Sequence, residues 1–179
     1  MKRNVIVFGL ISGLMISVFM VGGMAWCYSS EKLEGSMVVG FSAMLLAFSL
    51  IFVAVKNYRD KYNNGVVSFG KAFQIGALIA LIGSSMYVLS WGVEYHFFMP
   101  DFMDKLTAHN LKVLQGNGVT AAQIAEKTKE FSSQKEMYGN PVLFALITYV
   151  EILPVGLIVS VIAALILKRK LNKGGLATA

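Results

Sequence analysis

Glu151 is the ionisable residue best placed for chemistry, because it interrupts a long apolar run from Val142 to Leu167. An ionised carboxylate near the centre of a membrane-spanning helix costs at least about 2.5 to 3.5 kcal/mol, so such residues are often functional. Pro154, three residues later, is expected to kink the helix and to free a backbone carbonyl at the same level. The pair predicts an intramembrane group that takes up a proton or binds a cation.

The same carboxyl also has a structural interpretation. A buried, protonated glutamic acid can donate a hydrogen bond to a serine or a carbonyl of a neighbouring helix, and so fix helix packing. Serines at intermediate depth in the other apolar runs are Ser12, Ser17, Ser42, Ser49, Ser84 and Ser85. The residues alone leave both interpretations open.

Glu94 and His96 form a second candidate site, at the end of the apolar run from Phe73 to Tyr95. Asp101 and His109 follow nearby, and two carboxylates with two imidazoles could in principle hold a metal ion. The HxxxH and HExxH spacings that identify metal sites are absent, however. We therefore predict no metal and no cofactor, and keep Glu94 and His96 as an interface candidate.

The usual signatures of catalysis and nucleotide binding fail on inspection. Gly65, Gly70 and Lys71 fit G-x-x-x-x-G-K, but Ala72 replaces the required hydroxyl and an apolar helix precedes the motif where a strand is needed. Cys27 has no clear histidine partner, and no serine lies in G-x-S-x-G. The sequence predicts no catalytic residue, no nucleotide and no enzyme.

Four apolar runs must position these side chains. Each reaches the roughly 20 residues that cross about 30 Å of hydrocarbon at 1.5 Å per residue. The runs are Val5 to Tyr28, Ser36 to Val55, Phe73 to Tyr95 and Val142 to Leu167. With 56% hydrophobic and 15% charged residues, the 179-residue chain is expected to be one all-α, integral membrane four-helix bundle covering residues 1–179.

The distribution of charge predicts the orientation in the membrane. Ten of the 16 basic residues precede the first run, lie between the second and third, or follow the fourth. The positive-inside rule then places both termini in the cytoplasm. This asymmetry accounts for the net charge of +6, so no nucleic-acid partner is expected.

Small residues recur at four-residue spacing within the runs, a pattern that lets helices approach closely in lipid. The rows are Gly9, Gly13 and Ser17; Ser36 and Gly40; Ala72, Gly76, Ala80 and Ser84; and Gly156, Ser160 and Ala164. They predict a tightly packed bundle, although a seam between two copies of the chain would use the same rows.

The segment from Phe97 to Asn140 is expected to form an extracytoplasmic helical hairpin. Gly116-Asn117-Gly118 breaks the chain, and Thr120 with Gln123 forms a capping box for the second helix. Its apolar stripes are expected to cover the mouth of the bundle as a lid, or to lie on the lipid interface. On the opposite side, Asn63-Asn64-Gly65 predicts a turn and Ser68 an N-cap.

Several motifs resemble an uncharacterised bacterial membrane family catalogued as domain of unknown function 4199. The likeness rests on Lys56 to Lys61, on Gly65 to Phe73, on Asn140-Pro141, on Glu151 to Ser160 and on Leu167 to Lys170. The resemblance implies a four-span bacterial inner-membrane protein and no activity. It places Tyr58, Arg59, Gly70, Lys71, Glu151 and Pro154 within family-like motifs.

The sequence favours two functions over a third, an enzyme that acts on lipid. The first is a non-catalytic binding, accessory or assembly component, whose partner in the bilayer is another membrane protein or a second copy of the chain. The alternative is a small ion- or proton-coupled carrier or channel that uses Glu151.

Overall fold

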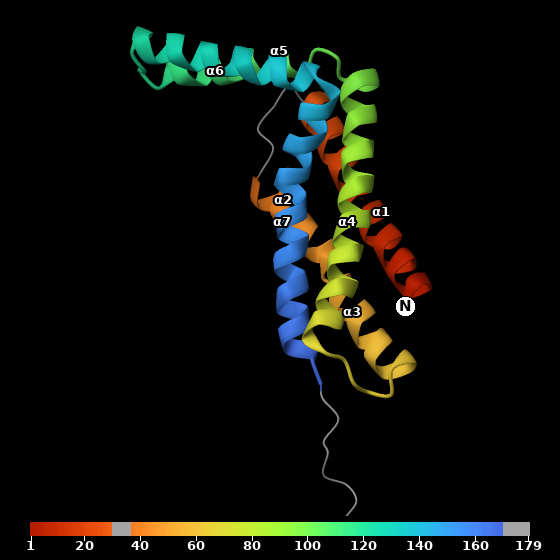
Figure 1. Cartoon of the computed structure of the whole chain (residues 1–179). Helices are drawn as coiled ribbons and strands as arrows, with labels where there is room; N and C mark the ends of the chain where they lie inside the picture. The colour runs from red at the N-terminus through yellow and green to blue at the C-terminus, as the bar shows by residue number, and fades with distance from the viewer. Residues whose placement is uncertain (30–36, 170–179) are drawn as a thin grey trace, which may run out of the picture.

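The computed structural model describes residues 1–29 and 37–169, and these form a helical bundle with a helical hairpin at one end (Figure 1). The elements are α1 (Lys2–Ser29), α2 (Met37–Phe48), α3 (Leu50–Asn57), the π-helical turn η1 (Tyr58–Tyr62), α4 (Phe69–Val93), the π-helical turn η2 (Glu94–Phe98), α5 (Phe102–Gly116), α6 (Ala121–Gly139) and α7 (Pro141–Leu167). The described residues contain no strand and one isolated β-bridge, between Val67 and Arg169.

The predicted fold class is confirmed, because the described residues form 4 helices that are long and apolar enough to cross a membrane. They run over Lys2–Tyr28, Val38–Tyr62, Phe69–Phe98 and Pro141–Leu167. The second and third helices extend further than their apolar runs, to Tyr62 and over Phe69–Phe98. The turn and the cap between them are as predicted: Asn64 and Gly65 have φ of 50° and 78°, and the Ser68 side chain accepts a hydrogen bond from the Lys71 amide.

Helix α4 lies at the centre of the bundle and packs against both α1 and α7 (Figure 1). A Cβ atom added at Gly76 would lie 2.7 Å from Ser160 Oγ, and one at Gly156 would lie 2.6 Å from Ala80 Cβ. The small residues therefore allow α4 and α7 to approach closely, as predicted. The prediction is wrong for Gly40, which has no atom within 4 Å of an added Cβ, and Ser36 lies outside the described residues.

Buried polar side chains join α1 to the second span. Asn4 is 6% exposed, and its side-chain amide donates to the carbonyl of Ala54 at 2.9 Å. Its own oxygen accepts from Asn57 at 2.8 Å, and Ser12 Oγ donates to the Ala47 carbonyl at 3.1 Å. These bonds satisfy polar groups that would otherwise be costly to bury.

Helices α5 and α6 form the predicted hairpin, and the capping box of Thr120 and Gln123 is present. The hairpin does not cover the bundle as a lid. It extends sideways from the end of the bundle, crosswise to the spans (Figure 1). Most of its residues are consequently exposed, and Met103 near the start of α5 is the buried exception among the described hairpin residues.

Candidate functional site

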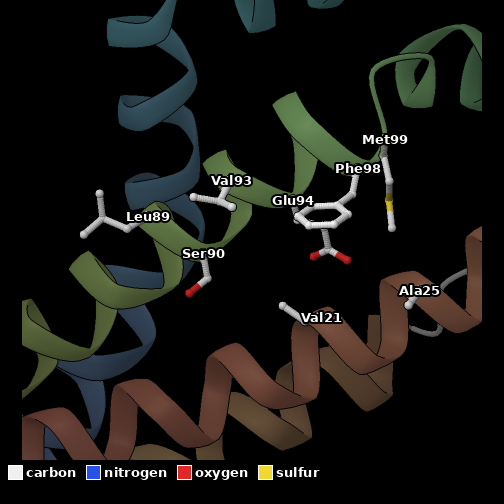
Figure 2. Close-up of a pocket in the computed structure, with 8 residues that line it drawn as sticks. All are labelled: Val21, Ala25, Leu89, Ser90, Val93, Glu94, Phe98 and Met99. Atoms are coloured by element: carbon white, nitrogen blue, oxygen red, sulfur yellow. The ribbon is translucent and has the colours of Figure 1, made fainter.

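An apolar groove lies between α1 and the last turns of α4 with η2, at the hairpin end of the bundle. It has a volume of about 490 Å³, within the range of about 300–1,000 Å³ for small-molecule sites. The lining residues are Val21 and Ala25 from α1, and Leu89, Ser90, Val93, Glu94, Phe98 and Met99 from the other wall (Figure 2). Several are exposed on the bundle surface, so the groove opens sideways to the surroundings of the spans.

Among the described residues that line this groove, Glu94 is the only ionisable one. It is 5% exposed, and its Oε2 atom is buried without a hydrogen-bond partner. Figure 2 shows the carboxyl group directed away from η2, into the space in front of Val21 on α1. A buried carboxyl oxygen without a partner is destabilising by about 1–3 kcal/mol or more, so its position needs an explanation.

The other polar group of the groove is the Ser90 hydroxyl. Ser90 Oγ donates to Ser17 Oγ at 3.0 Å, which ties the two walls together and uses the hydroxyl hydrogen. The Ser90 oxygen keeps the capacity to accept a hydrogen bond. The groove therefore presents acceptors, and no lysine, arginine or histidine of the described ranges 1–29 and 37–169 lines it.

A polar cluster joins the two walls just beyond the groove. Tyr28, one turn after Ala25, donates a hydrogen bond to Asp101, which follows Met99 by two residues. Lys105 Nζ lies 3.1 Å from Asp101 Oδ2 and 4.0 Å from the centroid of the Tyr28 ring. The hydrogen bond from Tyr28, and then the one from Lys105, hold the pKa of Asp101 below its ordinary value.

Acidification is expected to release α1 from the start of α5. Because the pKa of Asp101 is lowered in the folded protein, its stabilising effect is complete above the ordinary pKa of about 3.9 and is lost as the pH falls through the folded value. Spin labels at Gly23 and Ala108 should show a narrow distance distribution at neutral pH that broadens below about pH 4. Asp101→Asn should be broad at both pH values; an unchanged wild-type distribution in acid would contradict this assignment.

The structure separates the predicted pair of Glu94 and His96. Side chains two residues apart on a helix do not face each other. His96 Nδ1 lies 3.0 Å from the Gly92 carbonyl, and its ring packs edge-on against Phe144 of α7, with centroids 5.7 Å apart. His96 thus belongs to an aromatic cluster that also contains Trp91, Tyr95, Phe102 and Tyr138. Among the described residues, no group of three or more His, Cys, Asp or Glu could hold a metal.

The position of Glu151 does not match the structural interpretation given above. Its side chain is exposed on the surface of the bundle, so the expectation of a buried glutamic acid is wrong. Two of the expected serine partners bond elsewhere: Ser85 Oγ donates to the Leu81 carbonyl and accepts from Tyr149, and Ser49 Oγ donates to the Leu46 carbonyl. Pro154 lies within α7, which continues as one helix to Leu167. The functional role of both residues stays a prediction.

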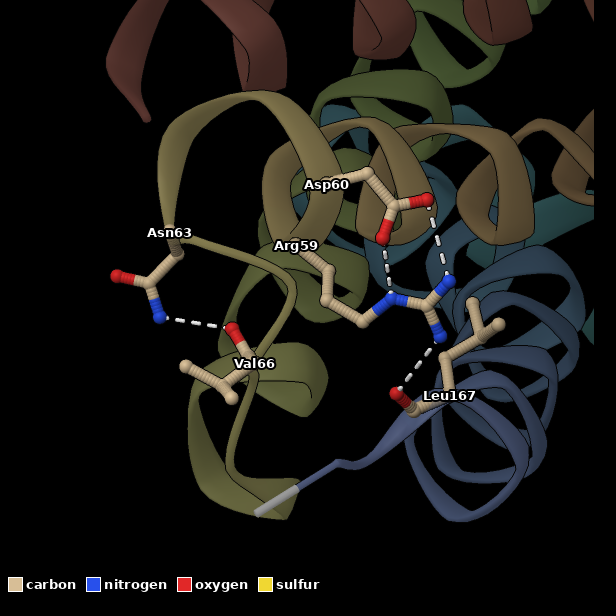
Figure 3. Close-up of polar contacts among 5 residues, drawn as sticks. All are labelled: Arg59, Asp60, Asn63, Val66 and Leu167. Atoms are coloured by element: carbon tan, nitrogen blue, oxygen red, sulfur yellow. Dashed lines mark hydrogen bonds and ion pairs between the residues drawn. The ribbon is translucent and has the colours of Figure 1, made fainter. Parts of the chain in front are cut away.

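Arg59 has a structural role at the loop end of the bundle (Figure 3). Its Nε lies 2.6 Å from Asp60 Oδ1, and its Nη1 donates to the carbonyl of Leu167 at 3.5 Å. A cation at the C-terminus of a helix offsets the partial negative charge of its free carbonyls. Arg59 therefore joins η1 to the end of α7, and Asn63 stabilises the following turn by donating to the Val66 carbonyl at 2.8 Å.

Tyr58 and Lys71 line a second hollow of about 500 Å³, together with Asn63, Ser68 and Arg169. Val67 and Arg169 exchange backbone hydrogen bonds of 3.0 and 2.8 Å, which holds the end of the described chain against this hollow. Lys71 Nζ donates to Gln74 at 3.0 Å. A Cβ atom added at Gly70 would meet open space, so close packing does not explain why this position is a glycine.

The sequence pointed to Glu94 but not to its surroundings. Val21 and Ala25 lie about 70 residues away in the chain and have the composition of any membrane-facing helix surface. No spacing rule connects them to Glu94. A polar residue one turn before the end of a span was the one available signal.

Comparison with known proteins identifies a family without assigning a role. A family model described as "Protein of unknown function (DUF4199)" matches residues 7–169. The comparison with curated proteins gives no match, and neither does the comparison with solved structures.

Proposed function

The chain belongs to the DUF4199 family of unknown function, and we propose a role for it from the geometry of the groove. The protein is a non-catalytic membrane protein that binds a lipid-like molecule in the groove between α1 and α4. The observation that carries the proposal is the buried Glu94 carboxyl, whose Oε2 lacks a partner and faces the groove. A bound molecule would supply the missing hydrogen bond and cover the exposed apolar walls.

The lining supports a ligand that enters from the bilayer. Val21, Leu89, Val93 and Phe98 are 42%, 69%, 52% and 71% exposed, and they surround the polar atoms on the open side of the groove. Acyl chains match such walls without losing hydrogen bonds, whereas a water-soluble polar molecule would leave its own groups unpaired there.

We further propose that both termini lie in the cytoplasm of a bacterial cell and that the hairpin and groove face the opposite side of the inner membrane. The excess of basic residues at the loop end supports this orientation. The exposed hairpin, which extends sideways, then offers a surface for another membrane protein or a second copy of the chain. A binding and accessory role fits both surfaces.

A carrier that uses Glu151 is the second candidate. The exposed carboxyl near the middle of α7 supports it, because an ionisable group on the outside of a bundle needs a partner in lipid. In such a carrier the partner would come from a second copy. Glu94 favours the binding role, since it combines burial, a missing hydrogen bond and a groove.

Filling the groove should abolish lipid retention. We expect Ala25→Trp to lower the fraction of protein that retains a dioleoyl phospholipid by about tenfold or more, because the indole occupies the space of an acyl chain. Native mass spectrometry of detergent-solubilised protein measures the retained adduct. Leu14→Trp is the matched control, since Leu14 lies on the same helix, is 58% exposed and does not line the groove. Equal retention by the two variants would refute the proposed function.

A further inference from the structure

Resting on the proposed function, we infer that the groove selects a lipid with a primary amine in its headgroup, held by the Glu94 carboxyl. The groove walls accept any acyl chain, so discrimination must come from the few polar atoms. These atoms accept hydrogen bonds, and this restricts the class of ligand.

A hydrogen-bond donor on the ligand would satisfy the free polar atoms of the groove. Glu94 Oε2 has no partner, and Ser90 uses its hydrogen on Ser17 at 3.0 Å. Both atoms can accept a hydrogen bond. A primary ammonium brings three N–H donors, whereas a choline headgroup brings none.

Charge favours the same ligand. Among the residues that the structure describes, no cationic side chain lines the groove, so an anionic headgroup without an amine would bring a negative charge next to the carboxyl. An ammonium instead forms a charge-assisted hydrogen bond, which is about twice as strong as a neutral one. The lipid phosphate would lie toward Lys105, which is at the same end of the groove beside Tyr28 and Asp101.

The bilayer is the source to which this inference commits. The side opening between exposed Leu89, Val93 and Phe98 is continuous with the outer surface of the spans. An aminophospholipid could place its chains along Val21 and Leu89 and its amine at Glu94. A small soluble amine would leave the apolar walls of the groove uncovered.

Native mass spectrometry with an equimolar mixture of dioleoyl phosphatidylethanolamine, phosphatidylcholine and phosphatidylglycerol tests the inference. We expect wild-type protein to retain the ethanolamine lipid about tenfold more than either competitor, the factor expected for one charge-assisted hydrogen bond. Glu94→Gln should lose this preference. Glu151→Gln, which also removes a carboxyl from a span, should keep it because Glu151 does not line the groove.

A wild-type experiment covers the case in which Glu94→Gln does not fold. Retention should fall stepwise as the ethanolamine nitrogen is methylated once, twice and three times, because each methyl group removes one N–H donor. Equal retention of the three headgroups by wild-type protein, or a preference that survives Glu94→Gln, would overturn the inference. If Ala25→Trp still removes all three lipids in that case, groove binding stands and only the headgroup assignment fails.

Discussion

Phe144→Ala is expected to detach the hairpin from the bundle and to lower the free energy of unfolding by about 3–5 kcal/mol, the usual cost of truncating a buried phenylalanine. Phe144 is 3% exposed, and its ring lies 5.4 Å from Tyr95 and 5.3 Å from Tyr138, between centroids. It thus connects α7 to η2 and α6. Reversible unfolding in mixed micelles measures the loss of stability.

Leu146→Ala is the control for Phe144→Ala, because Leu146 lies on α7 and is 55% exposed. It should change stability by a small fraction of that amount. A change for Phe144→Ala no larger than for Leu146→Ala would show that the aromatic cluster does not hold the hairpin.

Gly156→Leu is expected to disrupt the contact of α4 with α7, at a cost of about 3 kcal/mol or failure to fold. An added Cβ would lie 2.6 Å from Ala80 Cβ and 3.0 Å from Phe48 Cζ, so even the first side-chain atom has no room. The helices must separate or shift to accept a larger residue. The same unfolding measurement, with retention on size-exclusion chromatography, reports the effect.

Gly40→Leu provides the matched control, since an added Cβ at Gly40 meets nothing within 4 Å. It should fold normally and gain helix propensity. If Gly156→Leu were as stable as Gly40→Leu, close packing at Gly156 would not be required for the bundle.

Local sequence patterns correctly predicted the features that depend on interactions between residues close together in the chain. The capping box of Thr120 and Gln123 and the cap at Ser68 are present as predicted, because each depends on neighbours three residues away. The small residues of α4 and α7 were also interpreted correctly. Gly40 shows the limit: the same spacing does not reveal which side of a helix faces a partner.

The candidate site depended on relations that no local pattern contains. Glu94 and His96 were paired because they are close in sequence, yet one faces α1 and the other packs against α7. One of the two interpretations of Glu151 required it to be buried, but its position around α7 leaves it exposed. These outcomes depend on how each helix is rotated about its axis, which packing decides.

The amino-acid sequence by itself determined the four membrane-crossing helices found in the described part of the chain, because the lengths of apolar runs and the need to satisfy backbone hydrogen bonds in lipid are properties of the chain alone. The tertiary structure alone decided that Val21 and Ala25 oppose Glu94 across a groove, and that the hairpin extends sideways. The physical reason is that long apolar helices present similar surfaces all round, so steric fit between distant segments selects the faces that meet.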